Sequence, residues 1–296
     1  MTTTTNPIAG VARSAMLVDL NIKVYSGRKK DKYTQERVVL DSHAGSSRAS
    51  SVYKNLFADC AELDAISKFQ AKARAEHYRL TIPWSDNGSR LLPTKAMLEY
   101  KKTMNVYQND FYKLVNAYLD KYDTLVAKAA FQLGTLFDRD EYPQRDIVEH
   151  KFAFFSSFMP LPTSGDFRLD VESEVQRELI EQYERSATAR VNEATQDLWE
   201  RLHGSLTRLS DRLVVEEDGK KRKFHDTMVT GALELCELLT TLNVANDPTL
   251  EKARRQLEDT LHGVEPSDLR KHDGHRMEIK QKVDSILEAF DWGLND

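Results

Sequence analysis

The sequence has little of what turn-rich or membrane-spanning proteins contain. Its 296 residues include only 12 Gly and 8 Pro, which argues against an all-β fold with many tight turns. No window approaches the roughly 18 consecutive apolar residues of a transmembrane helix. The first ten residues also lack the charged and apolar regions of a secretory signal peptide. We therefore expect a cytoplasmic protein that does not enter a membrane.

Catalytic and metal-binding signatures are also missing. The two cysteines, Cys60 and Cys236, each stand in an apolar helical context without a second cysteine or histidine nearby, so we expect reduced core residues. His272 and His275 are three residues apart, but Gly274 between them favours a solvated linker over a metal site. Phosphate-binding glycine loops, nucleophile elbows and zinc-protease motifs do not occur. We expect no metal, no cofactor and no enzymatic activity.

Charge is plentiful and unevenly distributed. Charged residues make up 30% of the chain, and the net charge of −5 argues against a general polyanion binder. Residues 1–150 hold 22 Lys and Arg against 18 Asp and Glu, whereas residues 151–296 hold 20 against 29. Two basic runs stand out, residues 28–32 and 220–223. Either run could contact nucleic-acid phosphates or form a solvated turn. The candidate nucleic-acid contacts are Lys220, Lys221, Arg222 and Lys223.

Apolar periodicity predicts a mainly α-helical fold. A stripe with steps of three and four runs over about three heptads and predicts a long helix over residues 94–137. A second helix is predicted over 172–215, and we expect the two to pair as antiparallel, coiled-coil-like rods. Shorter helices are expected over 32–43 and 50–81. The first stripe consists of Met97, Tyr100, Met104, Tyr107, Phe111, Leu114 and Tyr118.

Alternating apolar residues predict a small three-stranded antiparallel sheet. Its expected strands are 17–25, 152–159 and 166–171, where apolar side chains recur at every second position or gather in an aromatic run. Between the first and second strands, the stretch Trp84–Pro93 contains the tight-turn signal Asn87-Gly88. We expect this stretch to be a loop that folds back onto the helices.

The positions at which the helical and strand patterns stop predict three segments. Residues 1–14 are expected to be a flexible N-terminal tail, and residues 15–245 an elongated helical domain with the small sheet. Residues 246–296 are expected to be C-terminal helices, with Asp247 and Ser267 as candidate helix caps.

Two further motifs combine an aromatic residue with an arginine. The first contains Trp84, Asn87, Gly88 and Arg90, and the second contains Asp166, Phe167 and Arg168. One interpretation is a buried Arg–Asp pair that fixes a loop to the sheet. The other is an exposed surface that docks a peptide.

These two motifs, together with residues 133–137 and Tyr142-Pro143, resemble a family of phage and mobile-element proteins of unknown function. The resemblance covers about residues 15–245 and rests on W-S-D-N-G-x-R-L-L-P and G-D-F-R. Members of that family are often encoded near MoxR-type AAA+ ATPases and VWA-domain proteins. The resemblance implies a protein partner and, for a phage protein, the host cytoplasm.

Two functions follow as hypotheses. The first is a non-enzymatic interaction or adaptor protein that binds an AAA+ ATPase or a second copy of itself. The alternative is a nucleic-acid-binding accessory protein in DNA replication or recombination, which the two basic runs and the positive first half favour.

Overall fold

The chain forms two compact units that are mainly helical. The computed structural model describes residues 7–85, 88–163, 173–215 and 222–293. Unit 1 comprises Met1–Asp19, Tyr78–Tyr100 and Phe158–Asp296, and unit 2 comprises Leu20–His77 and Lys101–Ser157. Among the described residues, no helix has the length and apolar character that crossing a membrane requires.

A four-stranded sheet has the strand order β4-β5-β1-β6, and β5 pairs antiparallel with β4 and with β1. Two of the three predicted strands are confirmed as β1 and β6, whereas the predicted strand 166–171 lies outside the described residues. The sequence pattern missed β4 and β5, because strands of two and four residues are too short to show alternation. The strands are β1 (Ala15–Lys23), β4 (Ile82–Pro83), β5 (Arg90–Pro93) and β6 (Ala153–Pro160).

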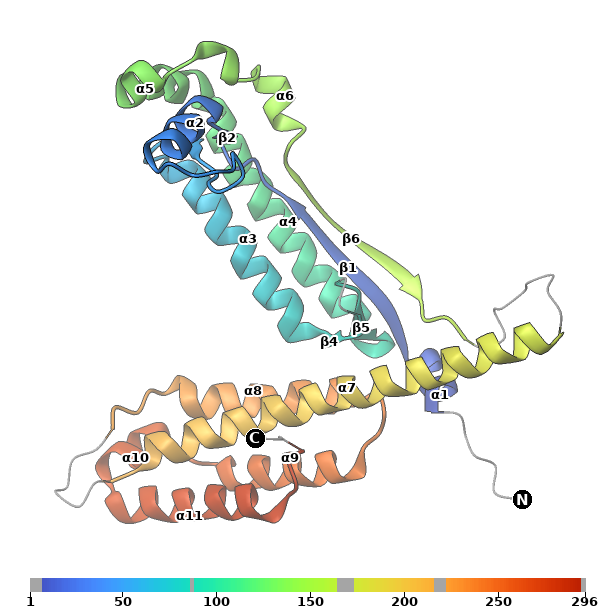
Figure 1. Cartoon of the computed structure of the whole chain (residues 1–296). Helices are drawn as coiled ribbons and strands as arrows, with labels where there is room; N and C mark the ends of the chain where they lie inside the picture. Colours follow the sequence, from blue (N-terminus) through green and yellow to red (C-terminus); the bar gives the residue numbers. More distant parts are fainter. Residues whose placement is uncertain (1–6, 86–87, 164–172, 216–221, 294–296) are drawn as a thin grey trace. The chain divides into compact units, whose positions relative to one another are not determined.

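Unit 2 contains a pair of antiparallel helices, α3 and α4, that lie side by side (Figure 1). Phe69 contacts Tyr107, and Glu62 near the start of α3 pairs with Lys121 just after α4. The elements of unit 2, some of which extend into unit 1, are β2 (Arg28–Lys30), α2 (Lys32–Asp41), β3 (Tyr53–Asn55), α3 (Ala61–Leu80), α4 (Met97–Asp120), α5 (Tyr122–Leu133), η2 (Gly134–Leu136), η3 (Arg139–Glu141) and α6 (Arg145–Glu149).

The aromatic stripe of α4 packs within unit 2, and its predicted pairing with residues 172–215 is wrong. The Phe111 ring is fully buried against Phe152 and Phe154 of the segment that forms β6. The predicted helix 94–137 is also interrupted, because α4 ends at Asp120 and α5 ends at Leu133 before Gly134, whose φ is +51°. Bulky rings at helical spacing indicated burial, but they did not specify the partner.

Helix α3 is shorter than the predicted helix 50–81. It begins at Ala61, and the residues before it form β3 and a turn in which Asp59 has a φ of +53°. A residue with positive φ cannot continue a right-handed helix. The predicted helix 32–43 is confirmed as α2.

Unit 1 is built around α7, which packs against α8, α9 and α11 (Figure 1). Its leucines from Leu198 to Leu213 are buried in one core with side chains of these helices. The predicted helix 172–215 is thus confirmed as an element. The other elements are α1 (Pro7–Ser14), η1 (Thr94–Ala96), α7 (Ser173–Leu213), α8 (Thr227–Leu242), α9 (Pro248–Leu261), α10 (Pro266–Lys271) and α11 (Asp273–Ala289).

The two units do not follow the predicted segment boundaries. Residues 7–14 form α1, and Val11 within it is buried in the core of unit 1, so this part is no flexible tail. The C-terminal helices share that same core with α7, because their leucine stripes need a partner surface to bury. Asp247 caps α9 as predicted, whereas the cap position of α10 is Glu265 and not Ser267.

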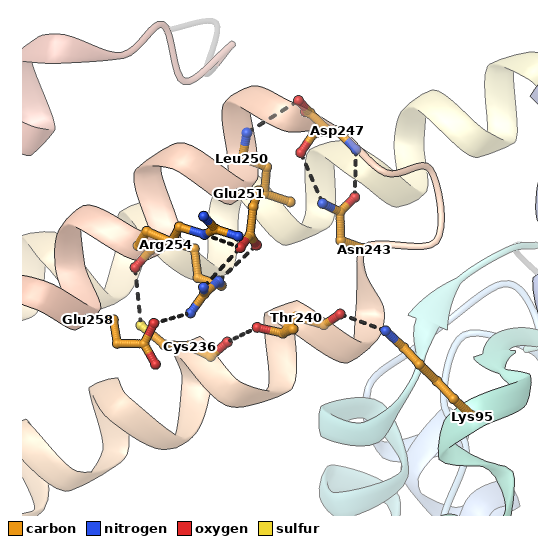
Figure 2. Close-up of polar contacts among 10 residues, drawn as sticks. Lys95, Cys236, Thr240, Asn243, Asp247, Leu250, Glu251, Arg254 and Glu258 are labelled. Carbon is orange, nitrogen blue, oxygen red and sulfur yellow. Dashed lines mark hydrogen bonds and ion pairs between the residues drawn. The ribbon is translucent and has the colours of Figure 1, made fainter.

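Ion pairs within α9 and a thiol contact from α8 surround Arg254 (Figure 2). The guanidinium of Arg254 is 7% exposed and pairs with Glu251 at 2.9 Å and with Glu258 at 2.7 Å. The Cys236 Sγ donates to the Arg254 carbonyl, and burial raises the pKa of this thiol to about 12. Both cysteines are buried and reduced, as predicted.

Replacing Phe111 by Ala should lower the free energy of unfolding of unit 2 by about 3–5 kcal/mol, because it leaves a cavity between α4 and β6. Phe131→Ala is the matched control. The Phe131 ring is 90% exposed, so its removal should change the same quantity by less than about 0.5 kcal/mol. Urea unfolding measures both variants, and equal midpoints for Phe111→Ala and the wild type would contradict this packing.

The Glu251–Arg254 pair should make the stability of unit 1 depend on pH. Hydrogen bonding to Arg254 lowers the pKa of Glu251 to about 2, whereas an unfolded chain has a value of about 4.3. The ionised carboxylate therefore stabilises the fold above about pH 4.3, and this contribution is lost as the pH falls towards 2. Glu251→Gln should destabilise the chain at pH 7 and match the wild type near pH 2 in thermal unfolding.

Glu278→Gln supplies the control for this pH dependence, because Glu278 and Lys282 form an exposed pair on α11. Exposed pairs contribute little, so this variant should show a smaller loss at pH 7. A Glu251→Gln defect of equal size at pH 7 and pH 2 would show that the pair does not act through its charge.

Candidate nucleic-acid interface

The first basic run forms one strand of a two-stranded antiparallel ribbon in unit 2. In this β2–β3 ribbon, Arg28 pairs with Asn55, Lys29 with Lys54 and Lys30 with Tyr53. Backbone hydrogen bonds extend the ribbon at both ends, from the Leu56 N–H to the Gly27 carbonyl and from the Asp31 N–H to the Val52 carbonyl. The run is therefore an ordered strand, whereas the sequence alone left a solvated turn as an alternative.

Gly27 allows the ribbon to approach the interior of unit 2. Its φ is +59°, and a Cβ at this position would lie 3.2 Å from the Phe57 ring and 3.3 Å from Leu63. A larger residue would be strained by its backbone and crowded by these side chains. Glycine is thus required where the chain enters β2.

The two lysines on one face of the ribbon share a single carboxylate. Successive side chains of a strand point to opposite faces, so Lys29 and Lys54 share one face. Glu141 of η3 pairs with the Lys54 Nζ at 2.5 Å and with the Lys29 Nζ at 3.8 Å. The Lys54 ammonium also donates to the Leu136 carbonyl at 2.8 Å. Side-chain exposures of 13% for Lys54 and 14% for Glu141 place this pair against the body of unit 2.

The opposite face, called the open face here, presents Arg28, Lys30, Tyr53 and Asn55. All four residues are exposed, and Tyr53 retains 61% of its surface. In the part of the chain that the structure describes, neither Arg28 nor Lys30 has an ion-pair partner. Two cations without a described ion-pair partner therefore share this face with an exposed aromatic ring.

Helix α2 follows the ribbon directly and adds a second exposed ring. Asp31 caps the helix, and its hydrogen bonds from the Thr34 N–H and hydroxyl hold the pKa of this carboxyl below its ordinary value. This acid is therefore satisfied locally. Tyr33 lies in the first turn and is 72% exposed, next to the exposed Lys32. Gln35 donates to the Ser47 carbonyl at 2.7 Å and fixes the loop that returns to β3.

The local net charge differs between the ribbon and the second basic run. Residues 20–55 contain eight Lys and Arg against three Asp and Glu, a net of +5, whereas residues 211–226 contain five of each. Charges within about 10 Å partly cancel for an approaching anion. The ribbon is therefore the better site for a polyanion.

Two of the four predicted contacts in the second run, Lys220 and Lys221, lie outside the described residues. Arg222 and Lys223 are exposed, and the Arg222 Nη1 donates to the Asp211 carbonyl at 3.4 Å. The Arg222 carbonyl accepts a hydrogen bond of 3.0 Å from the buried Arg276 guanidinium. Arg276 also donates to the carbonyls of Arg212 and Leu213 at the end of α7. This contact anchors the described end of the run to the core of unit 1.

The Trp84 motif has a structural role in unit 1. Trp84 is buried in the core, with the Arg190 guanidinium over its ring. Gly88 has a φ of +103°, as the predicted tight turn requires, while Asn87 lies outside the described residues. Because its ring is inside the core, Trp84 offers little surface to a docking peptide.

Arg90 fixes the end of α3, and its described partners are Thr81 and Tyr78. Its Nε donates to the Thr81 hydroxyl at 2.7 Å, and the guanidinium lies over the Tyr78 ring. Burial lowers the pKa of Arg90. The Thr81 carbonyl accepts from the Arg90 Nη2 at 3.1 Å and from the Arg201 Nη2 at 2.8 Å, and Arg201 also pairs with Asp197 at 2.8 Å. Asp166, Phe167 and Arg168 lie outside the described residues.

Two adjoining hollows in unit 1, of about 280 and 450 Å³, have Arg79, Glu234 and Leu238 in common. The larger one also has Glu99 and Glu237 in its wall. These carboxylates disfavour a polyanion. Around His272 and His275, as elsewhere among the described residues, no group of three or more His, Cys, Asp or Glu is placed to hold an ion.

Sequence reasoning missed Tyr53, Tyr33 and Glu141 as parts of the site. Tyr53 falls in a segment for which apolar spacing predicted a helix, and Glu141 is distant in sequence from both lysines. Two sequence features could have indicated the ribbon. Gly27 precedes the short basic run 28–30, and residues 53–55 form a second short segment with an aromatic residue.

Comparison with protein-family models, with curated proteins and with solved structures gave no match for this chain.

Proposed function

We propose that the protein binds nucleic acid, without catalysis, through the open face of the β2–β3 ribbon. The observation that carries this proposal is the partition of charge across the ribbon. Glu141 pairs with Lys54 and Lys29 on one face, whereas Arg28 and Lys30 on the other face have no described ion-pair partner.

Phosphate contacts suit these two cations. Arg28 offers a planar donor fork and Lys30 a compact point charge, and both groups bind phosphate oxygens. Each phosphate that a cation neutralises releases condensed counterions, which favours binding at low salt and carries no base sequence information. The expected activity is therefore sequence-tolerant binding, as an accessory protein of DNA replication or recombination would need.

Replacing Arg28 and Lys30 together by Ala should weaken DNA binding and flatten its salt dependence. Loss of two phosphate contacts should reduce the slope of log K against log salt by about 1.8 for duplex and about 1.4 for single strands. Fluorescence anisotropy of the full chain between about 50 and 200 mM salt measures this slope.

The double variant Arg222→Ala and Lys223→Ala removes the same charge from the second basic run and serves as the matched control. Its slope should stay close to that of the wild type. Absence of wild-type binding at about 50 mM salt, or an equal loss in both double variants, would contradict the proposal.

A second candidate function, an adaptor for a partner protein, rests on exposed apolar side chains of unit 2. Phe131 of α5 is 90% exposed, and Leu136 of η2 and Ile147 of α6 are each about half exposed. Large apolar side chains in water are typical of surfaces that a partner covers. A MoxR-type AAA+ ATPase is the proposed partner, because of the resemblance of the Trp84 and Asp166 motifs to a family encoded beside such enzymes.

Phe131→Asp should weaken a complex with a purified MoxR-type ATPase at least tenfold, since it places a charge where an apolar contact is expected. Isothermal titration calorimetry measures the affinity, and sedimentation of the chain alone tests self-association. Val106→Asp, at another exposed apolar position of unit 2, is the control and should leave the affinity unchanged. Absence of a complex at micromolar concentrations would contradict this function.

A further inference from the structure

We propose that Tyr53 is a stacking platform for an unpaired base, so that the open face prefers single-stranded over double-stranded nucleic acid. This inference rests on the proposed nucleic-acid binding and adds that the bound nucleic acid is single-stranded. It follows from the position of one exposed ring on the same face as two cations.

Tyr53 shares the open face with both cations. Lys30 is its direct cross-strand partner, and the side chains of such a pair stand on the same face of the ribbon. Arg28 stands two residues before Lys30, and alternation returns it to that face. A strand whose phosphates contact Arg28 and Lys30 would therefore bring its bases close to the Tyr53 ring.

The Tyr53 ring is available for stacking. Its exposed fraction is 61%, and among the described residues it has no ring contact or hydrogen bond. The rings beneath the ribbon are buried against one another, since Phe57 contacts Tyr25, Tyr118, Tyr122 and Tyr142. Base stacking on an aromatic side chain tolerates any sequence, because every base has a π-face.

The strand that carries Tyr53 is fixed to the core of unit 2. The Leu56 carbonyl, one residue after β3, accepts a hydrogen bond of 2.6 Å from the buried Tyr142 hydroxyl. Phe57 follows directly and is buried among the rings named above. At the other end, the Asp31 N–H donates to the Val52 carbonyl. A ring on a strand held at both ends loses little conformational entropy when a base covers it.

Stacking of this kind distinguishes single strands from duplexes. In a duplex each base already stacks on its neighbours, so an exposed ring gains nothing unless a base is unstacked first, which is costly. A single strand presents free base faces. Tyr33, the second exposed ring, lies in the first turn of α2, directly after β2, and offers a further aromatic surface for a base.

The test compares the full chain and its Tyr53 variants on four ligands of about 20 nucleotides. These ligands are an oligothymidine, an oligouridine, an abasic strand of the same length and a duplex. Tyr53→Leu should weaken binding to both single strands about tenfold and change binding to the abasic strand and the duplex by less than twofold. DNA and RNA should respond alike, since both present the same base faces. Tyr53→Phe keeps the ring and should keep the affinity.

The salt slope separates a lost ring from a damaged ribbon. With the ribbon intact, Arg28 and Lys30 still contact phosphate, so the slope of Tyr53→Leu should equal that of the wild type. An equal loss on all four ligands, or no loss on the single strands, would overturn the stacking role while leaving the proposed function standing. Failure of the wild type to bind any ligand would overturn the proposed function itself.

Discussion

The ion pair between Glu141 and Lys54 determines which face of the β2–β3 ribbon points away from η3. The pair is mostly buried, with an Nζ to carboxylate distance of 2.5 Å, and Lys29 adds its charge at 3.8 Å. Two lysines and one carboxylate on the same side fix the orientation of the β2–β3 ribbon towards η3. Because strand side chains alternate, this contact leaves Arg28, Lys30 and Tyr53 on the side away from η3. The proposed binding surface depends on that one acid.

The aromatic core of unit 2 holds the end of β3 in place. Tyr122 and Tyr142 donate their hydroxyls to the carbonyls of Pro143 and Leu56, so each ring is buried with its polar atom satisfied. Burial raises the pKa of Tyr142 to about 12, and the hydroxyl remains a donor throughout the neutral range. The same rings pack on Phe57, two residues after β3. Core packing and the position of Tyr53 are therefore linked through a few residues of one strand.

Elements with a long, regular pattern could be predicted from the sequence, and short elements and partners could not. Forty-one residues of α7 follow an unbroken apolar stripe, and Asp247 before Pro248 marks the start of α9. The predicted partner of Phe111 was wrong, because an apolar ring can be buried equally well against a strand or a helix. Tyr53 was missed because a three-residue strand is too short to show a period, and because its pairing partner Lys30 lies 23 residues away in the sequence. The Glu141 contact is tertiary and has no local signal.

The central claim is that nucleic acid lies on the open face of the ribbon. Photo-cross-linking of the full chain to an oligonucleotide carrying photoreactive thymidines, followed by peptide mapping, tests it directly. The account predicts cross-links on the peptide that contains Tyr53, with a further site at or next to Tyr33. Cross-links confined to residues 211–226, or to the hollows lined by Glu99, Glu234 and Glu237, would contradict it.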